Sequence, residues 1–187
     1  MSHLSKVEAM DTFFGIPAHP LFVHIPAVLI PLAAVGVVIM LVRPTWWERY
    51  KWATLVVAGA GMLGAIFAAA SGEGLEEGVE RSADRSQLRT HVAAGETART
   101  VSIVFFIILF AAVVVVPWWM KRRNAATGAP KWLRPVVAIA LVAGAGSASW
   151  TVFKAGHSGA KSVWGEVKAG ESKGGDRGEK GGEGDND

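Results

Sequence analysis

Cysteine is absent from this chain of 187 residues. Without thiols the chain cannot form a disulfide, hold an iron–sulfur cluster through thiolates or attach a c-type haem at a C-x-x-C-H motif. It also lacks a phosphate-binding loop, a G-x-S-x-G motif and an H-E-x-x-H motif, which mark common soluble enzymes. A metal or cofactor bound here must therefore be held by nitrogen or oxygen atoms.

Charged residues are absent from four long runs, although the chain as a whole has 19 Lys and Arg and 16 Asp and Glu. A bilayer core of roughly 30 Å is crossed by about 20 apolar helical residues, and each run has about this length. The sequence therefore predicts an all-α integral membrane protein, a four-helix bundle. The predicted spans are residues 21–42, 52–71, 100–120 and 135–153.

Basic residues are concentrated in two of the loops between the predicted spans. Loops 43–51 and 121–134 together carry eight Lys and Arg and a single acidic residue, Glu48. By the positive-inside rule we expect these loops to be cytoplasmic and both termini to be extracytoplasmic, in a bacterial cytoplasmic membrane. Tryptophans at the cytoplasmic ends of the spans fit an interfacial belt. They are Trp46, Trp47, Trp52, Trp118, Trp119 and Trp132.

The segments outside the spans differ in composition. Residues 1–16 form an N-terminal extracytoplasmic segment, residues 17–165 the membrane domain, and residues 166–187 a glycine-rich charged tail that we expect to be disordered. The connection 72–99 is too long for a bare loop, so we expect a helix from about Asp84 that continues into the third span. Small residues spaced four apart in the second span, such as Gly61 and Ala65, predict close helix packing.

Four histidines converge on one end of the predicted bundle. His19 and His24 open the first span, His91 precedes the third, and His157 follows the fourth. Ionisable groups at a membrane edge are costly and usually face a bundle interior or a cavity, and imidazole is a common ligand of haem iron and transition metals. His19 and His24 lie about 140° apart on an ideal helix, so only one can point inward. Because Pro20 biases the residue before it away from helical geometry, we expect the inward ligand to be His24.

Three functions fit this pattern. The first is a haem b electron carrier in which His24 and either His91 or His157 ligate the iron, with a quinol as donor; two haems would use His19 as well. Arg99 would then contact a haem propionate or pair with Glu96. The second is a zinc or copper protein in which three or four histidines bind the metal, with His24, His91 and His157 as ligands and Glu96 as a candidate further ligand. The third is an accessory or structural subunit whose histidines only form hydrogen bonds.

The partners can be predicted more coarsely than the function. We expect an electron carrier or accessory subunit and not a stand-alone enzyme. Membrane lipid is the common partner, with a quinol, a separate redox protein and a further copy of the chain as candidates. Nucleic acid is not expected, because the basic residues mark topology.

Three motifs resemble a known family. They are "HPLFVHIPAVLIPLA" at the start of the first span, "HVAAGETAR" before the third and "GHSGAKSVW" after the fourth. Over about residues 15–165 the chain is similar to the DUF2231 family of bacterial four-span membrane proteins of unknown function. Relatives joined to Rieske-type or other redox domains imply a respiratory or electron-transfer setting, with histidines at positions 19, 24, 91 and 157.

Overall fold

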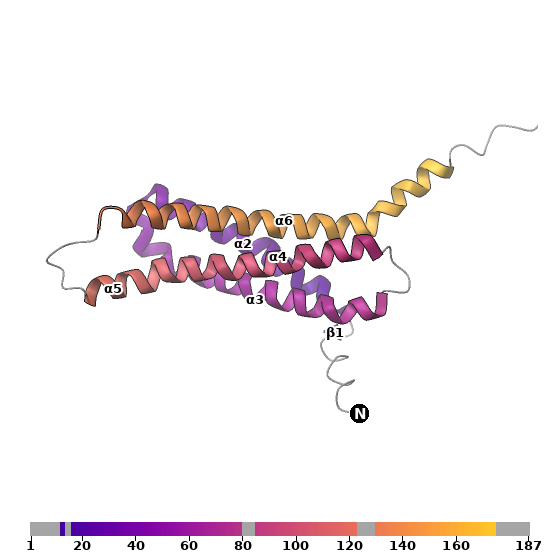
Figure 1. Ribbon diagram of the computed structural model, residues 1–187, viewed down its shortest axis with the longest axis horizontal. Helices are drawn as coiled ribbons and strands as arrows, with labels where there is room; N and C mark the ends of the chain where they lie inside the picture. Colours follow the sequence, from indigo (N-terminus) through magenta and orange to yellow (C-terminus); the bar gives the residue numbers. More distant parts are fainter. Residues whose placement is uncertain (1–11, 14–15, 80–84, 123–129, 175–187) are drawn as a thin grey trace, which may run out of the picture.

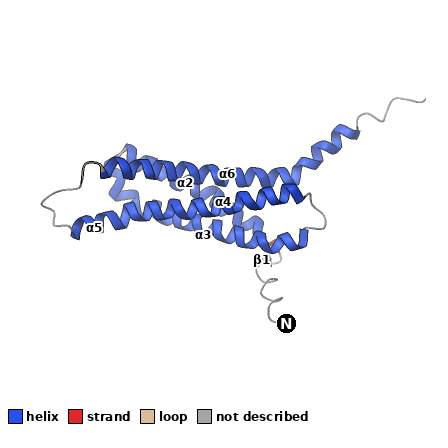
Figure 2. Cartoon of the chain, viewed as in Figure 1, coloured by secondary structure: helices blue, strands red, loops and turns tan. Residues whose placement is uncertain are grey.

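Four helices lie side by side along one long axis in the computed structural model, which describes residues 12–13, 16–79, 85–122 and 130–174 (Figure 1). The described chain is almost entirely helical (Figure 2). The long helices are α2 (Ala18–Val42), α3 (Trp47–Val79), α4 (Arg85–Phe110) and α6 (Leu133–Gly174). Shorter elements are the antiparallel pair β1 (Thr12–Phe13) and β2 (Ile16–Pro17), the 3-10 turn η1 (Pro44–Trp46), the π-helical turn η2 (Ala111–Val115) and α5 (Val116–Arg122).

Prolines explain two irregular joints. Pro44 opens η1, where its fixed φ starts a new turn and separates α2 from α3. Pro117 is the second residue after the π-helical turn η2, so the carbonyl four residues earlier, that of Val113, lies within this turn. Because proline has no N–H and its ring clashes with the carbonyl four residues earlier, the α4 hydrogen-bond ladder is interrupted here, and a wide turn absorbs the defect.

The core is built from inward-facing stripes of apolar residues. Bulky side chains come from α2 and α4, where Ile30, Met40, Phe105 and Leu109 are fully or almost fully buried. Small residues come from α3 and α6, so that the helices approach closely. Their buried members include Ala58, Ala65, Ala145 and Ala148.

Glycines mark the closest crossing, between α2 and α3. A Cβ added at Gly64 would lie 2.5 Å from Cγ2 of Ile25, and one added at Gly61 would lie 2.8 Å from Cδ1 of Ile30. The predicted packing role of the small residues in the second span is confirmed here. Gly144 on α6 has a similar role against Phe105, at a looser 3.3 Å.

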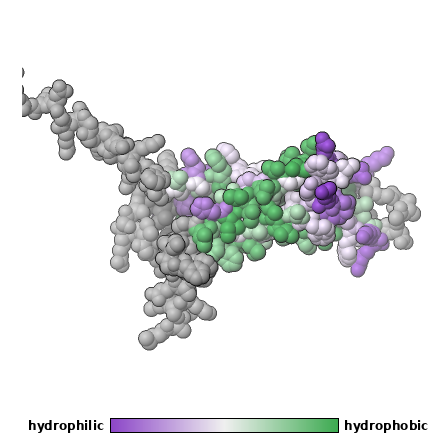
Figure 3. All heavy atoms as spheres, turned by 180° about the vertical axis from the view of Figure 1, so that it is seen from behind, coloured by the Kyte–Doolittle hydropathy of each residue, from purple (hydrophilic) through white to green (hydrophobic). Residues whose placement is uncertain are grey.

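All four long helices are apolar enough to cross a membrane. The outer surface has an apolar middle, and hydrophilic residues gather at the end formed by the α2–α3 turn and α5 (Figure 3). The membrane-crossing segments are Leu21–Val42, Pro44–Gly72, Arg89–Arg122 and Leu133–Ala160. The predicted all-α membrane bundle is therefore confirmed, and α4 begins at Arg85, next to the predicted start.

The C-terminal helix is longer than the sequence suggests. α6 continues to Gly174, so residues 166–174 are helical although they belong to the segment expected to be disordered. The rest of the predicted tail, residues 175–187, lies outside the described residues, as does most of the segment 1–16.

Candidate functional site

Two histidines from different helices meet at the end of the bundle away from the tryptophans. His19 lies in the first turn of α2 and His91 in the second turn of α4. Their ring centres are 6.1 Å apart and the ring planes are nearly perpendicular, at 89°. Both side chains are partly buried. We call this arrangement the histidine pair.

His19 is held by the last apolar turn of α3. Its Nδ1 atom lies 2.9 Å from the carbonyl oxygen of Ala68 and 3.3 Å from Oγ of Ser71. Ser71 is itself buried and donates to the same Ala68 carbonyl over 3.1 Å. Gly72 lies against the ring, where a Cβ would be 3.2 Å from Cε1.

His91 is held by α6 in the same manner. Its Nδ1 atom lies 3.1 Å from Oγ of Ser158, and Ser158 donates to the carbonyl of Ala155 over 2.8 Å. The backbone of Ala155 also interacts with the His91 imidazole. A Cβ at Gly159 would lie 2.9 Å from Cε1 of His91, so only glycine leaves room for the ring.

These contacts determine which nitrogen of each ring carries the proton. A carbonyl oxygen can only accept, so Nδ1 of His19 must donate to Ala68. The Ser158 hydroxyl hydrogen is used toward Ala155, so Nδ1 of His91 donates to the lone pair of Ser158. In the neutral imidazoles both Nε2 atoms are therefore acceptors. A neutral Nε2 with a hydrogen-bonded Nδ1–H is the usual state of a metal-ligating histidine.

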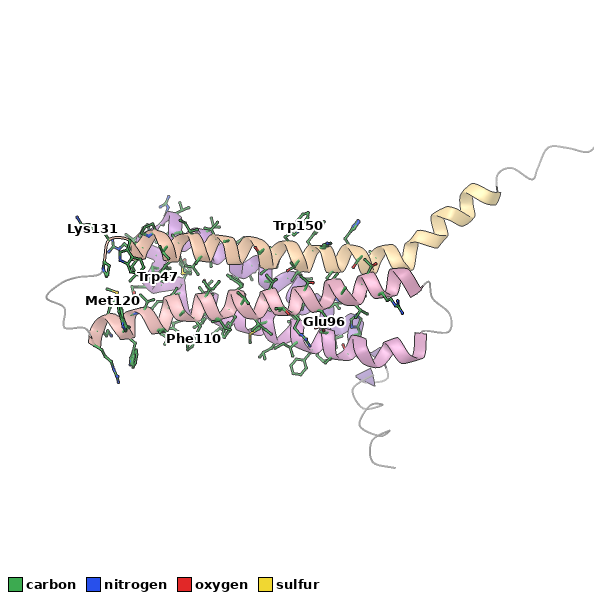
Figure 4. All side chains as sticks on the ribbon, viewed as in Figure 1. Trp47, Glu96, Phe110, Met120, Lys131 and Trp150 are labelled. Atoms are coloured by element: carbon green, nitrogen blue, oxygen red, sulfur yellow. The ribbon has the colours of Figure 1, made fainter. Side chains whose placement is uncertain are left out.

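The histidine pair lies near the outer ends of the apolar segments, which reach Arg89 on α4 and Ala160 on α6. Counted from Trp118 and Trp132, a core of about 30 Å, or about 20 helical residues, ends near Ala98 on α4 and Val152 on α6. His91 and Ser158 lie one to two turns further out. Figure 4 shows Trp47, Met120 and Lys131 at one end of the bundle and Glu96 toward the other end.

The structure reverses the predicted orientation of the two N-terminal histidines. His24 lies on an exposed face of α2, and His19 faces the neighbouring helices. The predicted angle of about 140° between them holds, but the choice of the inward residue was wrong. α2 begins at Ala18, so Pro20 falls in the first turn, where its missing N–H is tolerated. His19 then falls seven residues before the buried Pro26, on the same helix face.

His157 also lies outside the histidine pair. Its side chain is exposed and its ring stacks on that of Phe153, with centres 6.2 Å apart. Within the described residues there is no group of three or more His, Cys, Asp and Glu side chains placed to hold one metal ion. The set of ligands predicted for zinc or copper, His24, His91 and His157, is therefore not brought together. His3 lies outside the described residues.

Arg99 forms an ion pair with Glu96, which lies one turn earlier on α4. Both side chains are about one-third exposed, at 35% and 37%. This pairing was one of the two predicted alternatives. Arg99 lies eight residues beyond His91, or about 12 Å deeper along the helix.

The residues that surround the histidine pair were not predicted from the sequence. They are Ser71 and Gly72 at the end of α3, and Ser158 and Gly159 near the end of the α6 core. A signal was present, because the pattern A-x-x-S-G occurs at residues 68–72 and again at 155–159. Both copies are at the same end of the bundle, each next to a histidine.

The fold defines a multi-pass α-helical membrane protein, with a pair of inward-facing histidines at one end of its bundle. The family of predicted membrane proteins named DUF2231 matches residues 15–169, and the chain belongs to this family. No curated protein and no solved structure matches the chain.

Proposed function

We propose that this protein is a membrane electron carrier that binds one haem b between His19 and His91. The observation that carries the proposal is the histidine pair, in which two imidazoles from different helices present neutral Nε2 atoms while their Nδ1–H groups are engaged. The identity of the haem ligands differs from that expected from the sequence. His24 and His157, which face outward, are not needed.

The number of ligands favours haem over a bare metal ion. A structural zinc site takes four protein ligands and a catalytic one takes three. The described residues bring two imidazoles together and no third His or carboxylate. A six-coordinate haem iron needs two axial ligands from the protein, because the porphyrin supplies the other four nitrogens.

The spacing allows both imidazoles to hold one group between the helices, because their ring centres are 6.1 Å apart. His19 and His91 would hold the haem iron through their Nε2 atoms. Small residues line both rings, and a Cβ at Gly95, one turn from His91, would meet no atom within 4 Å. The residues present thus fit the group.

Each part of the chain has a defined task in this proposal. A bound haem would supply a one-electron redox couple. Ala68 and Ser71 hold the Nδ1 proton of His19, and Ser158 holds that of His91, which makes the Nε2 atoms better electron donors.

The position of the site supports the proposed partners. It lies at the rim of the apolar band, within reach of a quinol dissolved in the bilayer and of a separate redox protein in the aqueous phase. Tryptophans and basic residues gather at the opposite end of the bundle, which supports a cytoplasmic assignment there and an extracytoplasmic site. The contact between Arg99 and a haem propionate stays a prediction.

The test is the dithionite-reduced minus oxidised visible spectrum of the purified full chain, expressed with ample haem. His19→Ala and His91→Ala should each abolish the sharp α-band of a six-coordinate haem b. His24→Ala and His157→Ala are matched controls at the same end of the bundle and should retain it. Loss of the band in a control but not in the paired positions, or a colourless folded wild-type protein, would overturn the proposal.

A further inference from the structure

The bundle contains the same two-helix unit twice. The A-x-x-S-G pattern occurs at residues 68–72 of α3 and 155–159 of α6, and a V-A-G-A-G sequence begins 11 residues before it in α3 (57–61) and 13 residues before it in α6 (142–146). The preceding helix of each unit carries one member of the histidine pair. The first unit is therefore α2 with α3, and the second is α4 with α6.

Burial follows this repeat. When α2 and α4 are aligned on His19 and His91, the buried positions 26, 30, 33, 37 and 40 correspond to the buried positions 98, 102, 105, 109 and 112. When α3 and α6 are aligned on Ser71 and Ser158, positions 54, 58, 61 and 65 correspond to 141, 145, 148 and 152, all of them buried. Equivalent residues thus face the same interior.

The contacts between the helices follow the same repeat. α2 packs on α3 and α4 packs on α6 within the units, while α3 packs on α4 and α6 packs on α2 between them. Figure 1 shows one unit, α4 and α6, in front of the other. Each imidazole is held within its own unit, so the two rings meet where the units meet.

We propose that the membrane domain is an internal repeat of a helical hairpin, and that Ser71 and Ser158 are equivalent positioning residues. Each orients the imidazole of its own unit toward one ligand on the axis that relates the units. The identity of that ligand as haem rests on the proposed function. The positioning role rests on the hydrogen bonds themselves.

The chemistry of the two serines supports this role. Each hydroxyl donates back to the carbonyl three residues earlier, Ser71 to Ala68 and Ser158 to Ala155. Its hydrogen is thereby committed, and its lone pairs are left to accept from the Nδ1–H group of the histidine. The serine therefore selects one tautomer, and glycine at the next position leaves room for the ring.

The first experiment does not involve haem. The full chain labelled with ¹⁵N-histidine is studied by NMR without haem in detergent, and the His19 and His91 signals are assigned with single substitutions. In the wild type both residues should show a protonated Nδ1 and an unprotonated Nε2. Ser158→Ala should raise the fraction of the other His91 tautomer, with the Ala155 backbone as the remaining partner of the ring, and leave His19 unchanged.

The variants of the other unit complete the test. Ser71→Ala should affect His19 alone and in the same direction, because in each unit a backbone partner of the imidazole remains, Ala68 for His19 and Ala155 for His91. Ser158→Thr, which keeps the hydroxyl, should restore the wild-type signals of His91. Ser147→Ala changes an exposed serine of α6 and is the matched control. An unchanged His91 tautomer in Ser158→Ala would overturn the positioning role, whether or not haem binds.

The second readout distinguishes this inference from the proposed function. In the haem-loaded protein both serine-to-alanine variants should raise the midpoint potential, because a less electron-rich imidazole stabilises ferric iron less. A shift in opposite directions would overturn the equivalence of the two units. A folded protein with the expected tautomers and no haem would remove the proposed function and leave the positioning role intact.

Discussion

Polar side chains are arranged in opposite ways at the two ends of the bundle. At the tryptophan end the cations lie on the outside, with Arg43 over Trp46 and Arg122 over Trp118. At the histidine end the imidazoles and hydroxyls turn inward and bond from helix to helix. The first arrangement anchors a helix in an interface at little cost, whereas the second orders polar groups between helices, which is costly unless they serve a purpose. The difference identifies the functional end.

The largest effect on the histidine end is expected from a substitution that fills the space beside His91. Gly159→Ala should displace the ring, because the new Cβ would lie 2.9 Å from Cε1. Overpacking of this kind costs about 1–3 kcal/mol, which corresponds to a loss of haem affinity of roughly 5- to 150-fold. Haem titration of the full-length variant measures the effect. Gly156→Ala, where a Cβ meets nothing within 4 Å, is the control, and equal losses in both would contradict the prediction.

A packing change away from both ends should lower stability without altering the site. Gly64→Ala would place a Cβ 2.5 Å from Cγ2 of Ile25, and we expect the free energy of unfolding to fall by about 1–3 kcal/mol. Thermal unfolding in detergent is the measurement, and the haem spectrum of the folded fraction should be unchanged. Gly146→Ala, which meets no neighbour, should unfold at or above the wild-type temperature.

The ion pair of Glu96 and Arg99 on α4 tests whether a polar group near the histidine pair, but not part of it, affects stability or the haem spectrum. Glu96→Gln breaks the pair with Arg99, but both side chains are about one-third exposed. The change in unfolding free energy should be below about 1 kcal/mol, and the α-band should keep its position. A shift of the band on removing this carboxylate would instead assign Glu96 to the haem environment.

The smallest effect is expected at the tryptophan end. Arg122→Gln removes a guanidinium that lies 4.1 Å from the centre of the Trp118 ring. At an exposed site such a contact contributes about 0.5–1 kcal/mol, so thermal unfolding should change slightly and the haem spectrum not at all. Loss of haem in this variant would show that the two ends are coupled.

The sequence was sufficient for the spans because uncharged runs of the right length leave few alternatives. The first span, Leu21–Val42, has the predicted bounds, and α4 begins where the charge pattern suggested. The gathering of histidines at one end follows from topology alone. The prediction of which residues of α2 face inward was wrong. The choice between His19 and His24 depends on where α2 begins, and Pro20 was taken as a barrier to helical geometry.

The buried positions of α2 indicate which face of the helix is directed inward. Buried positions 26, 30, 33, 37 and 40 repeat at alternating steps of four and three, and continued backward they reach 19 and pass over 24. Ser71 and Ser158 were missed because serine near a helix end has many ordinary roles. Only their pairing with histidines across a helix interface, which requires three-dimensional distances, singles them out.

The repeat has a consequence for how a membrane-dissolved molecule meets this protein. The seams between the units, α3 against α4 and α6 against α2, lie on opposite flanks of the bundle. Under the internal symmetry, both flanks offer the same approach to the axis on which the histidines meet. A molecule that diffuses sideways in the bilayer would therefore encounter two equivalent entrances, and blocking one would leave about half of the encounter rate.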